Sequence, residues 1–173
     1  MKTSVSVFLF CISLAWAGQA WATAWPDSCG DSKVKFNVKT EKDQPAPAGP
    51  AEGKAQIVFI ENESGPIGTF MYATVRFGMD GAWVGADYNN SYFTSTVDPG
   101  VHHLCASWQS ALGRLKKNID LTSFTAEPGQ VYYFAAHVTV ASRDSVIFGL
   151  SQLNEDEGKY RVKLSKLSTS KPK

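Results

Sequence analysis

The chain has little of the chemistry on which enzymes and nucleic-acid-binding proteins depend. Its 173 residues include 3 cysteines and 3 histidines, and no HExxH, GxSxG or spaced Cys/His motif, so neither a zinc centre nor a nucleophilic serine is indicated. Positive and negative charges are also nearly balanced, with 17 Lys and Arg against 16 Asp and Glu. This balance excludes a strong overall positive potential that would attract nucleic acid. We therefore expect no catalytic residues, metal, cofactor or nucleic acid; His102 and His137 are the remaining candidates for an unrecognised hydrolase.

The one long apolar stretch stands at the start of the chain. Lys2 precedes an apolar run over residues 5–17, and small residues follow at Ala20, Ala22 and Ala24. This order is typical of a secretory signal peptide spanning residues 1–24, cut after Ala22 or Ala24; a membrane anchor is the alternative, although the run is short for a stable span. Cys11 lacks a lipobox, because three large apolar residues precede it. The prediction is a periplasmic or secreted protein.

Removal of residues 1–24 leaves two cysteines, Cys29 and Cys105, and equal numbers of acidic and basic residues. A lone pair of cysteines in an oxidising compartment predicts one disulfide. In the chain-entropy model, closing a loop of about 76 residues stabilises the fold by about 4.5 kcal/mol. Two free thiols, or a bond from Cys29 to another chain, are the alternatives.

Most of the chain alternates between short strand patterns and turn residues. Apolar and polar residues alternate over 34–38 and 73–77, and β-branched and aromatic residues fill 92–97 and 131–140. Asp80-Gly81 is the dipeptide of a tight hairpin, and Pro99-Gly100 and Pro128-Gly129 fit type II turns. Since no long helical period is present, we predict an all-β fold, an antiparallel β-sandwich of about 7–9 strands.

The pattern divides the exported chain into three parts. Residues 25–52 hold a strand and a Pro-rich linker, 53–167 the β-sandwich, and 168–173 a basic tail. Residues 155–164 fit two patterns. Acids followed by bases favour a short helix or turn, whereas alternation of Tyr160, Val162 and Leu164 with basic residues favours a strand. We favour the helix or turn.

Aromatic residues offer the one candidate for a binding surface. Most of them fall on strand faces that the alternation predicts to be buried. Trp83, Tyr88 and Tyr92 would form a stacking platform for a glycan or small ligand if they gathered on the surface. The alternative is that these three side chains belong to the core.

Several turn motifs also occur in a familiar order. They are Asp80-Gly81-Ala82-Trp83-Val84-Gly85, Asn90-Ser91-Tyr92-Phe93, Val97-Asp98-Pro99-Gly100-Val101-His102 and Ala126-Glu127-Pro128-Gly129-Gln130-Val131-Tyr132-Tyr133. In this order they resemble the bacterial family called domain of unknown function 2846, over about residues 53–165. Similar hairpins occur in PEGA-type and carboxypeptidase-regulatory-like domains. The resemblance implies an exported β-sandwich of the bacterial envelope, with no catalytic residues to carry over.

Together these patterns predict a non-catalytic module of the bacterial envelope that serves a structural role or binds an unknown envelope protein. The alternative is a small-ligand or glycan-binding module that uses exposed aromatics.

The cysteine pair yields a first test. Without reductant, Cys105→Ser should melt several degrees below the wild type, because the unfolded chain regains the entropy of an open loop. Differential scanning calorimetry with and without reductant measures the shift. Equal melting of the wild type in both conditions would contradict the disulfide.

Overall fold

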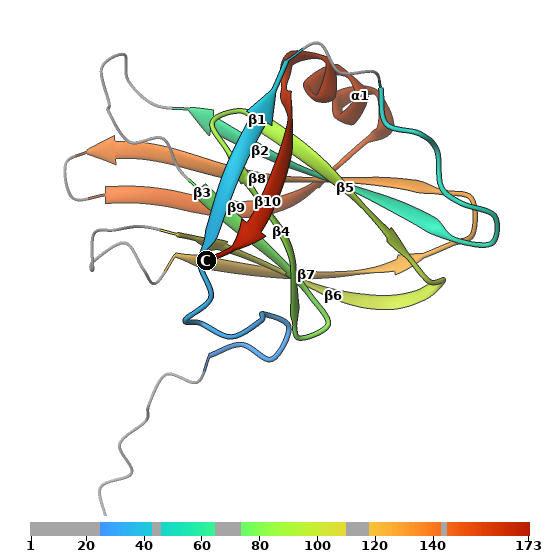
Figure 1. Ribbon diagram of the computed structural model, residues 1–173, viewed down its shortest axis with the longest axis horizontal. Coiled ribbons are helices and arrows are strands. Elements are labelled where there is room, and N and C mark those ends of the chain that lie inside the picture. The colour runs from blue at the N-terminus through green and yellow to red at the C-terminus, as the bar shows by residue number, and fades with distance from the viewer. Residues whose placement is uncertain (1–24, 43–45, 65–73, 110–117, 143–144) are drawn as a thin grey trace, which may run out of the picture.

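Two β-sheets stack on each other in the computed structural model, which describes residues 25–42, 46–64, 74–109, 118–142 and 145–173 (Figure 1). One sheet has six strands in the order β1-β10-β5-β2-β8-β9, and the other has four in the order β4-β3-β6-β7. The elements are β1 (Phe36–Glu41), β2 (Ala55–Ser64), β3 (Thr74–Met79), β4 (Ala82–Tyr88), β5 (Ser91–Val97), β6 (Gly100–Trp108), β7 (Ile119–Ala126), β8 (Val131–Ser142), β9 (Ser145–Leu153), α1 (Glu155–Leu164) and β10 (Lys166–Pro172). The predicted β-sandwich is confirmed, with ten strands in the described residues where 7–9 were expected.

Aromatic rings from both sheets fill the space between them. The Phe59 ring of β2 lies 4.9 Å from Phe77 of β3 and 5.0 Å from Phe93 of β5, centroid to centroid. On the other side of the core, Phe134 of β8 lies 5.0 Å from Phe124 of β7. Alternation along each strand turns these side chains to one face, so strands β2 to β9 contribute to the same apolar layer.

The larger sheet is mixed, which corrects the purely antiparallel arrangement expected from the sequence. Strand β2 runs parallel to β8, and β10 runs parallel to β5. Parallel neighbours need long connections. Here the chain between β2 and β8 builds the whole four-stranded sheet before it returns.

Side chains join the edges of the two sheets. On one side the Ala86 N–H of β4 donates to Ser170 Oγ of β10 at 3.0 Å, and Ser168 Oγ donates to the Ala86 carbonyl at 3.4 Å. On the other side the Leu150 N–H of β9 donates to Asp120 Oδ2 of β7 at 2.7 Å. These bonds satisfy edge groups that a sandwich otherwise leaves open to solvent or to other chains.

Residues 155–164 form helix α1, the alternative that we favoured. Asn154 caps it, since its side-chain oxygen accepts from the Glu157 N–H at 2.9 Å. The helix covers the outer face of the six-stranded sheet, where it encloses a second apolar cluster that includes Tyr92 and Tyr133. Gly158 allows this close approach, because a Cβ at that position would lie 2.2 Å from the Tyr133 ring.

The first and last strands of the described residues lie side by side in the larger sheet. Strand β1 pairs antiparallel with β10, from Phe36 opposite Pro172 to Glu41 opposite Leu167. The segment 168–173, expected to be a basic tail, is therefore almost wholly a sheet strand, and the strand of 25–52 belongs to the sandwich as well. The alternating pattern predicted a strand at β1. It could not predict that β10 lies beside this strand, because the sequence of a strand does not specify which strand it pairs with.

The turn residues adopt the backbone that glycine and aspartate tolerate. Asp80 and Gly81 both have positive φ, 51° and 88°, as the tight hairpin requires. Gly129 has φ 77°, which fits the predicted type II turn, whereas Gly100 has φ 139°, outside the range of that turn.

A buried carboxyl group lies at the end of β4. Asp87 is fully buried, and its Oδ1 accepts hydrogen bonds from Ser168 and Ser91, while Oδ2 has no hydrogen-bond partner among the described residues. Burial raises the pKa of Asp87 well above its ordinary value; the hydroxyls oppose this shift and the nearby Glu61 carboxylate adds to it. The folded protein therefore holds a proton on Asp87 at pH values where the unfolded chain has lost it.

This proton makes stability depend on pH. A raised folded-state pKa means that the contribution of Asp87 is fully present below pH 3.8, its ordinary pKa, and is lost as pH rises toward the folded value. Urea unfolding at a series of pH values should show the wild type losing stability relative to Asp87→Asn, by at most about 1.4 kcal/mol per pH unit. Parallel pH profiles for the two proteins would contradict a protonated Asp87.

Candidate functional site

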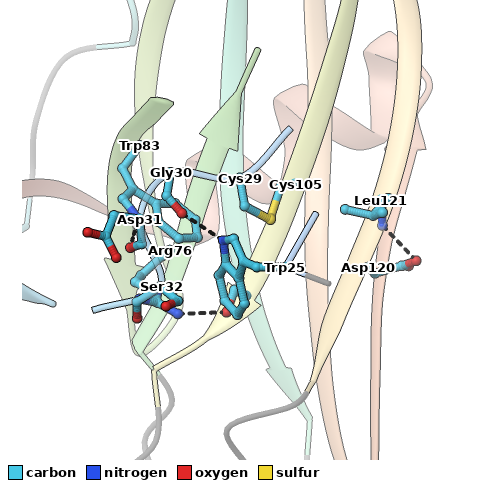
Figure 2. Close-up of a disulfide and its surroundings, with 11 residues drawn as sticks. Trp25, Cys29, Gly30, Asp31, Ser32, Arg76, Trp83, Cys105, Asp120 and Leu121 are labelled. Carbon is cyan, nitrogen blue, oxygen red and sulfur yellow. Dashed lines mark hydrogen bonds between the residues drawn. A yellow bond between two sulfur atoms is a disulfide. The ribbon is translucent and has the colours of Figure 1, made fainter. Parts of the chain in front are cut away.

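Residues 25–35, which we call the strap, cross the outer face of the four-stranded sheet. The disulfide between Cys29 and Cys105 of β6 ties the strap to that sheet, with 5.3 Å between the Cα atoms (Figure 2). The Gly81 N–H adds a hydrogen bond to the Ser28 carbonyl at 3.2 Å. The predicted cysteine pair is thus confirmed, and it fixes which face of the small sheet is covered.

Trp83 and Arg76 of the small sheet pack against the strap, which contributes Trp25. The Arg76 guanidinium lies 4.5 Å from the centroid of the Trp83 ring and 5.8 Å from that of the Trp25 ring, so both rings are its aromatic neighbours. The Trp83 indole donates to the Asp31 carbonyl at 2.8 Å and joins the strap to β4, while Trp25 donates to the Gly30 carbonyl at 2.7 Å within the strap (Figure 2).

Arg76 is buried without an acidic partner. Its side chain is 5% exposed, and its terminal nitrogens donate to the carbonyls of Ser32 and Val34 and to Ser107 Oγ. No carboxylate in the described part of the chain pairs with it, and Nε has no acceptor there. Burial lowers the pKa of Arg76, because the charged guanidinium is poorly solvated at this position.

A hollow of about 420 Å³ opens beside this guanidinium. Its wall combines aromatic rings with cations and contains no acidic side chain. The lining residues are Trp25, Ser32, Lys33, Lys35, Arg76, Trp108 and Gln109. The Gln109 side chain is held in place by a pair of hydrogen bonds with the backbone of Phe36, at 2.6 and 2.9 Å. We call this cavity the strap hollow.

The aromatic platform predicted from Trp83, Tyr88 and Tyr92 does not form. Trp83 lies half-buried beneath the strap, Tyr88 stands half-buried at the far end of β4, and Tyr92 is 3% exposed in the cluster under α1. The expectation of exposure is wrong for Tyr92, because the helix covers that face of the sheet. Trp25, Arg76 and Trp108 were not identified from the sequence; the predicted disulfide was the available signal, since it requires the strap to lie over the outer face that holds Arg76.

His102 has a structural role near the start of β6, where it joins the Asp80-Gly81 hairpin to the turn at Asp98. Its Nδ1 lies 2.7 Å from Asp80 Oδ2 and its Nε2 lies 2.8 Å from the Asp98 carbonyl, while Asp80 Oδ1 accepts from the His103 N–H. Both ring nitrogens face acceptors, so the charged imidazolium fits the site best. Partial burial lowers the pKa of His102, but the bonds to Asp80 and Asp98 outweigh it and the pKa lies above its ordinary value. Partial burial raises the pKa of Asp80, but the hydrogen bonds from the His103 N–H and from His102 outweigh it, and the pKa lies below its ordinary value.

His137 lies next to a serine, although a catalytic set is not assembled around it. Its Nε2 is 2.9 Å from Ser151 Oγ on β9. Burial lowers the pKa of His137, and so does Arg161, against an opposing effect of Glu157. Glu157 itself is bound by Arg161, and no carboxylate of the described residues is hydrogen-bonded to the histidine. Over the same residues, no three His, Cys, Asp or Glu side chains gather as metal ligands.

The His102 pair gives a prediction that nuclear magnetic resonance can test. Asp80→Asn should lower the pKa of His102, because the amide removes the negative charge that favours the imidazolium. In the wild type this stabilisation is fully present below the ordinary histidine pKa of 6.5 and is lost as pH rises through the higher folded value. A titration of the imidazole C–H signals measures both proteins, and an unchanged His102 pKa in the variant would refute the ion pair.

Comparison with protein-family models, curated proteins and solved structures returns no match for this chain. The resemblance to the domain of unknown function 2846 family therefore stays a prediction that depends on its motifs.

Proposed function

We propose that this protein is an exported, non-catalytic binding module of the bacterial envelope, and that the strap hollow binds the anionic group of an acidic glycan. The signal-peptide pattern and the disulfide support export, and the motif resemblance supports the envelope. Glycan binding was the alternative function predicted from the sequence, and the site proposed for it here contains other aromatic residues than those predicted. The observation that carries this proposal is the burial of the Arg76 guanidinium without an acidic partner among the described residues.

A buried cation without a carboxylate is costly, because carbonyl dipoles and aromatic faces replace only part of its hydration. Folded proteins usually pair such a charge with an acid. Arg76 instead borders an open hollow whose wall has no acid of its own. An anion entering this hollow would gain from the guanidinium and would relieve its unbalanced charge.

The other lining residues fit a sugar acid in particular. Lys33 and Lys35 are exposed, alternate residues of the strap's end, and both line the hollow, so they add positive charge at its rim. The partly exposed Trp25 offers an apolar ring face for the C–H side of a pyranose. A hollow with an aromatic wall and a few convergent polar groups is the usual form of a small-ligand site.

A non-catalytic role agrees with the state of the titratable groups. His102 has both nitrogens engaged in the hairpin, and His137 faces Ser151 away from the hollow's lining. The hollow itself offers cations and rings but no general base. Binding, rather than turnover, is what these side chains support.

Tryptophan fluorescence can test the proposal, because Trp25 and Trp108 both line the hollow. Oligomers of galacturonic acid should change the emission and bind, whereas uncharged galactose oligomers of equal length should not. Lys33→Gln/Lys35→Gln should weaken binding about 3- to 30-fold, the loss expected for two exposed charge contacts.

Lys42→Gln/Lys163→Gln is the matched control, since it removes the same charge from two exposed lysines that do not line the strap hollow. It should bind as the wild type does. Equal binding of neutral and acidic oligomers, or equal affinity of the two double variants, would overturn the proposal.

A further inference from the structure

The outer face of α1 carries two large apolar side chains that nothing in the described part of the protein covers. Tyr160 is 62% exposed and Leu164 is 67% exposed. They are four residues apart, so they stand one above the other on the same helix face. The inner face is already occupied, because Gly158 packs on Tyr133 and Val162 packs on the cluster around Tyr92. Two apolar side chains therefore stand on the solvent side of a helix whose other exposed residues are charged.

Positive charge gathers beside these two side chains. A hollow of about 450 Å³ runs along the end of α1, and Leu164 forms part of its wall. Lys42, Lys163 and Lys166 line the same hollow, and no acidic side chain does. None of the three lysines has an ion pair among the described residues.

The acidic residues of the helix lie at its other end. Glu155, Asp156 and Glu157 occupy the first turn, where Glu155 pairs with Lys159 and Glu157 pairs with Arg161. Lys163 complements the negative end of the helix dipole, which is an ordinary arrangement. Lys42 and Lys166 are different, because Lys42 directly follows β1 and Lys166 begins β10, so they line the hollow from two other elements.

We propose that this surface, defined by Lys42, Tyr160, Lys163, Leu164 and Lys166 and called the helix patch, docks on an anionic lipid bilayer. Peripheral binding to a membrane increases with the apolar area that enters it and with electrostatic attraction to anionic lipids, and the two exposed apolar side chains and the lysines offer one contribution of each kind. Tyr160 has the amphipathic ring that suits the headgroup level, and Leu164 reaches toward the acyl chains. The hollow between the lysines accepts a lipid phosphate.

The partner is a bilayer because of the combination of charge and shape. The patch joins a cluster of cations to two protruding apolar groups, and an anionic membrane offers both a negative surface and an apolar layer beneath it. The exported chain as a whole has balanced charge, so the attraction is local to this end of the molecule. Docking is peripheral, since no helix in the described ranges has the length and apolar character to cross a bilayer.

Cosedimentation of the protein with lipid vesicles tests the proposal. Vesicles with phosphatidylglycerol should retain the protein, and vesicles of phosphatidylcholine alone should retain much less. Lys42→Gln/Lys163→Gln/Lys166→Gln should lower the partition coefficient on anionic vesicles by about fivefold per lysine. Tyr160→Ser/Leu164→Ser should also lower it, and raising the salt should weaken binding of the wild type.

Two matched controls separate the patch from general surface effects. Lys33→Gln/Lys35→Gln/Lys171→Gln removes three exposed lysines elsewhere, and Val101→Ser/Ile147→Ser removes two equally exposed apolar side chains. Both should sediment with vesicles as the wild type does. Since the lysines of the strap hollow belong to the first control, failure of vesicle docking and failure of glycan binding are distinguishable.

Three results would overturn bilayer docking. The first is equal retention on neutral and anionic vesicles, and the second is equal loss in patch variants and controls. The third is a dimer in size-exclusion chromatography that Tyr160→Ser/Leu164→Ser converts to a monomer, because the occupant of the patch is then a second copy of the chain.

Discussion

The bond between Cys29 and Cys105 sets the character of the face on which function is proposed. It holds the strap against the four-stranded sheet, and the strap turns an outward strand position into a buried one. Arg76 would otherwise be an ordinary solvent-facing residue of β3. Covered by the strap, it becomes a desolvated cation between two tryptophans, next to a hollow without acids. One covalent constraint thereby links the stability of the domain to the chemistry of its candidate site.

The ionisable groups in the interior of this protein differ in their charge state. Arg76 keeps its charge, supported by carbonyls and ring faces, while Asp87 is placed so that it keeps its proton. His102 lies between these cases, because it is partly exposed and has an acceptor at each nitrogen. The two proposed binding surfaces are both cationic and stand on different elements, the strap hollow on the small sheet and the helix patch on α1. A chain with almost no net charge therefore has two separate positive regions on its surface. Its overall composition does not reveal them.

Much of the fold could be predicted from local sequence. Asp80-Gly81 indicated a hairpin because its turn needs positive φ at both positions, and Cys29 and Cys105 are the two cysteines of the sequence after residue 24. The helix was ambiguous at Tyr160 to Leu164, yet Asn154 followed by Glu157 is a capping signal that favours it. What sequence alone could not show was spatial neighbourhood. The parallel pairing of β2 with β8, the burial of Tyr92 under α1 and the covering of Arg76 all depend on which distant segments meet.

The order of the six-stranded sheet has a consequence for how the protein is made. The first strand, β1, stands at the sheet's edge, and its one neighbour there is β10, the last strand of the chain. Strand β1 therefore gains its ladder of hydrogen bonds only after β10 has been synthesised. Until then β1 has no strand to pair with, so this edge of the six-stranded sheet is completed late in folding although its outermost strand is made early.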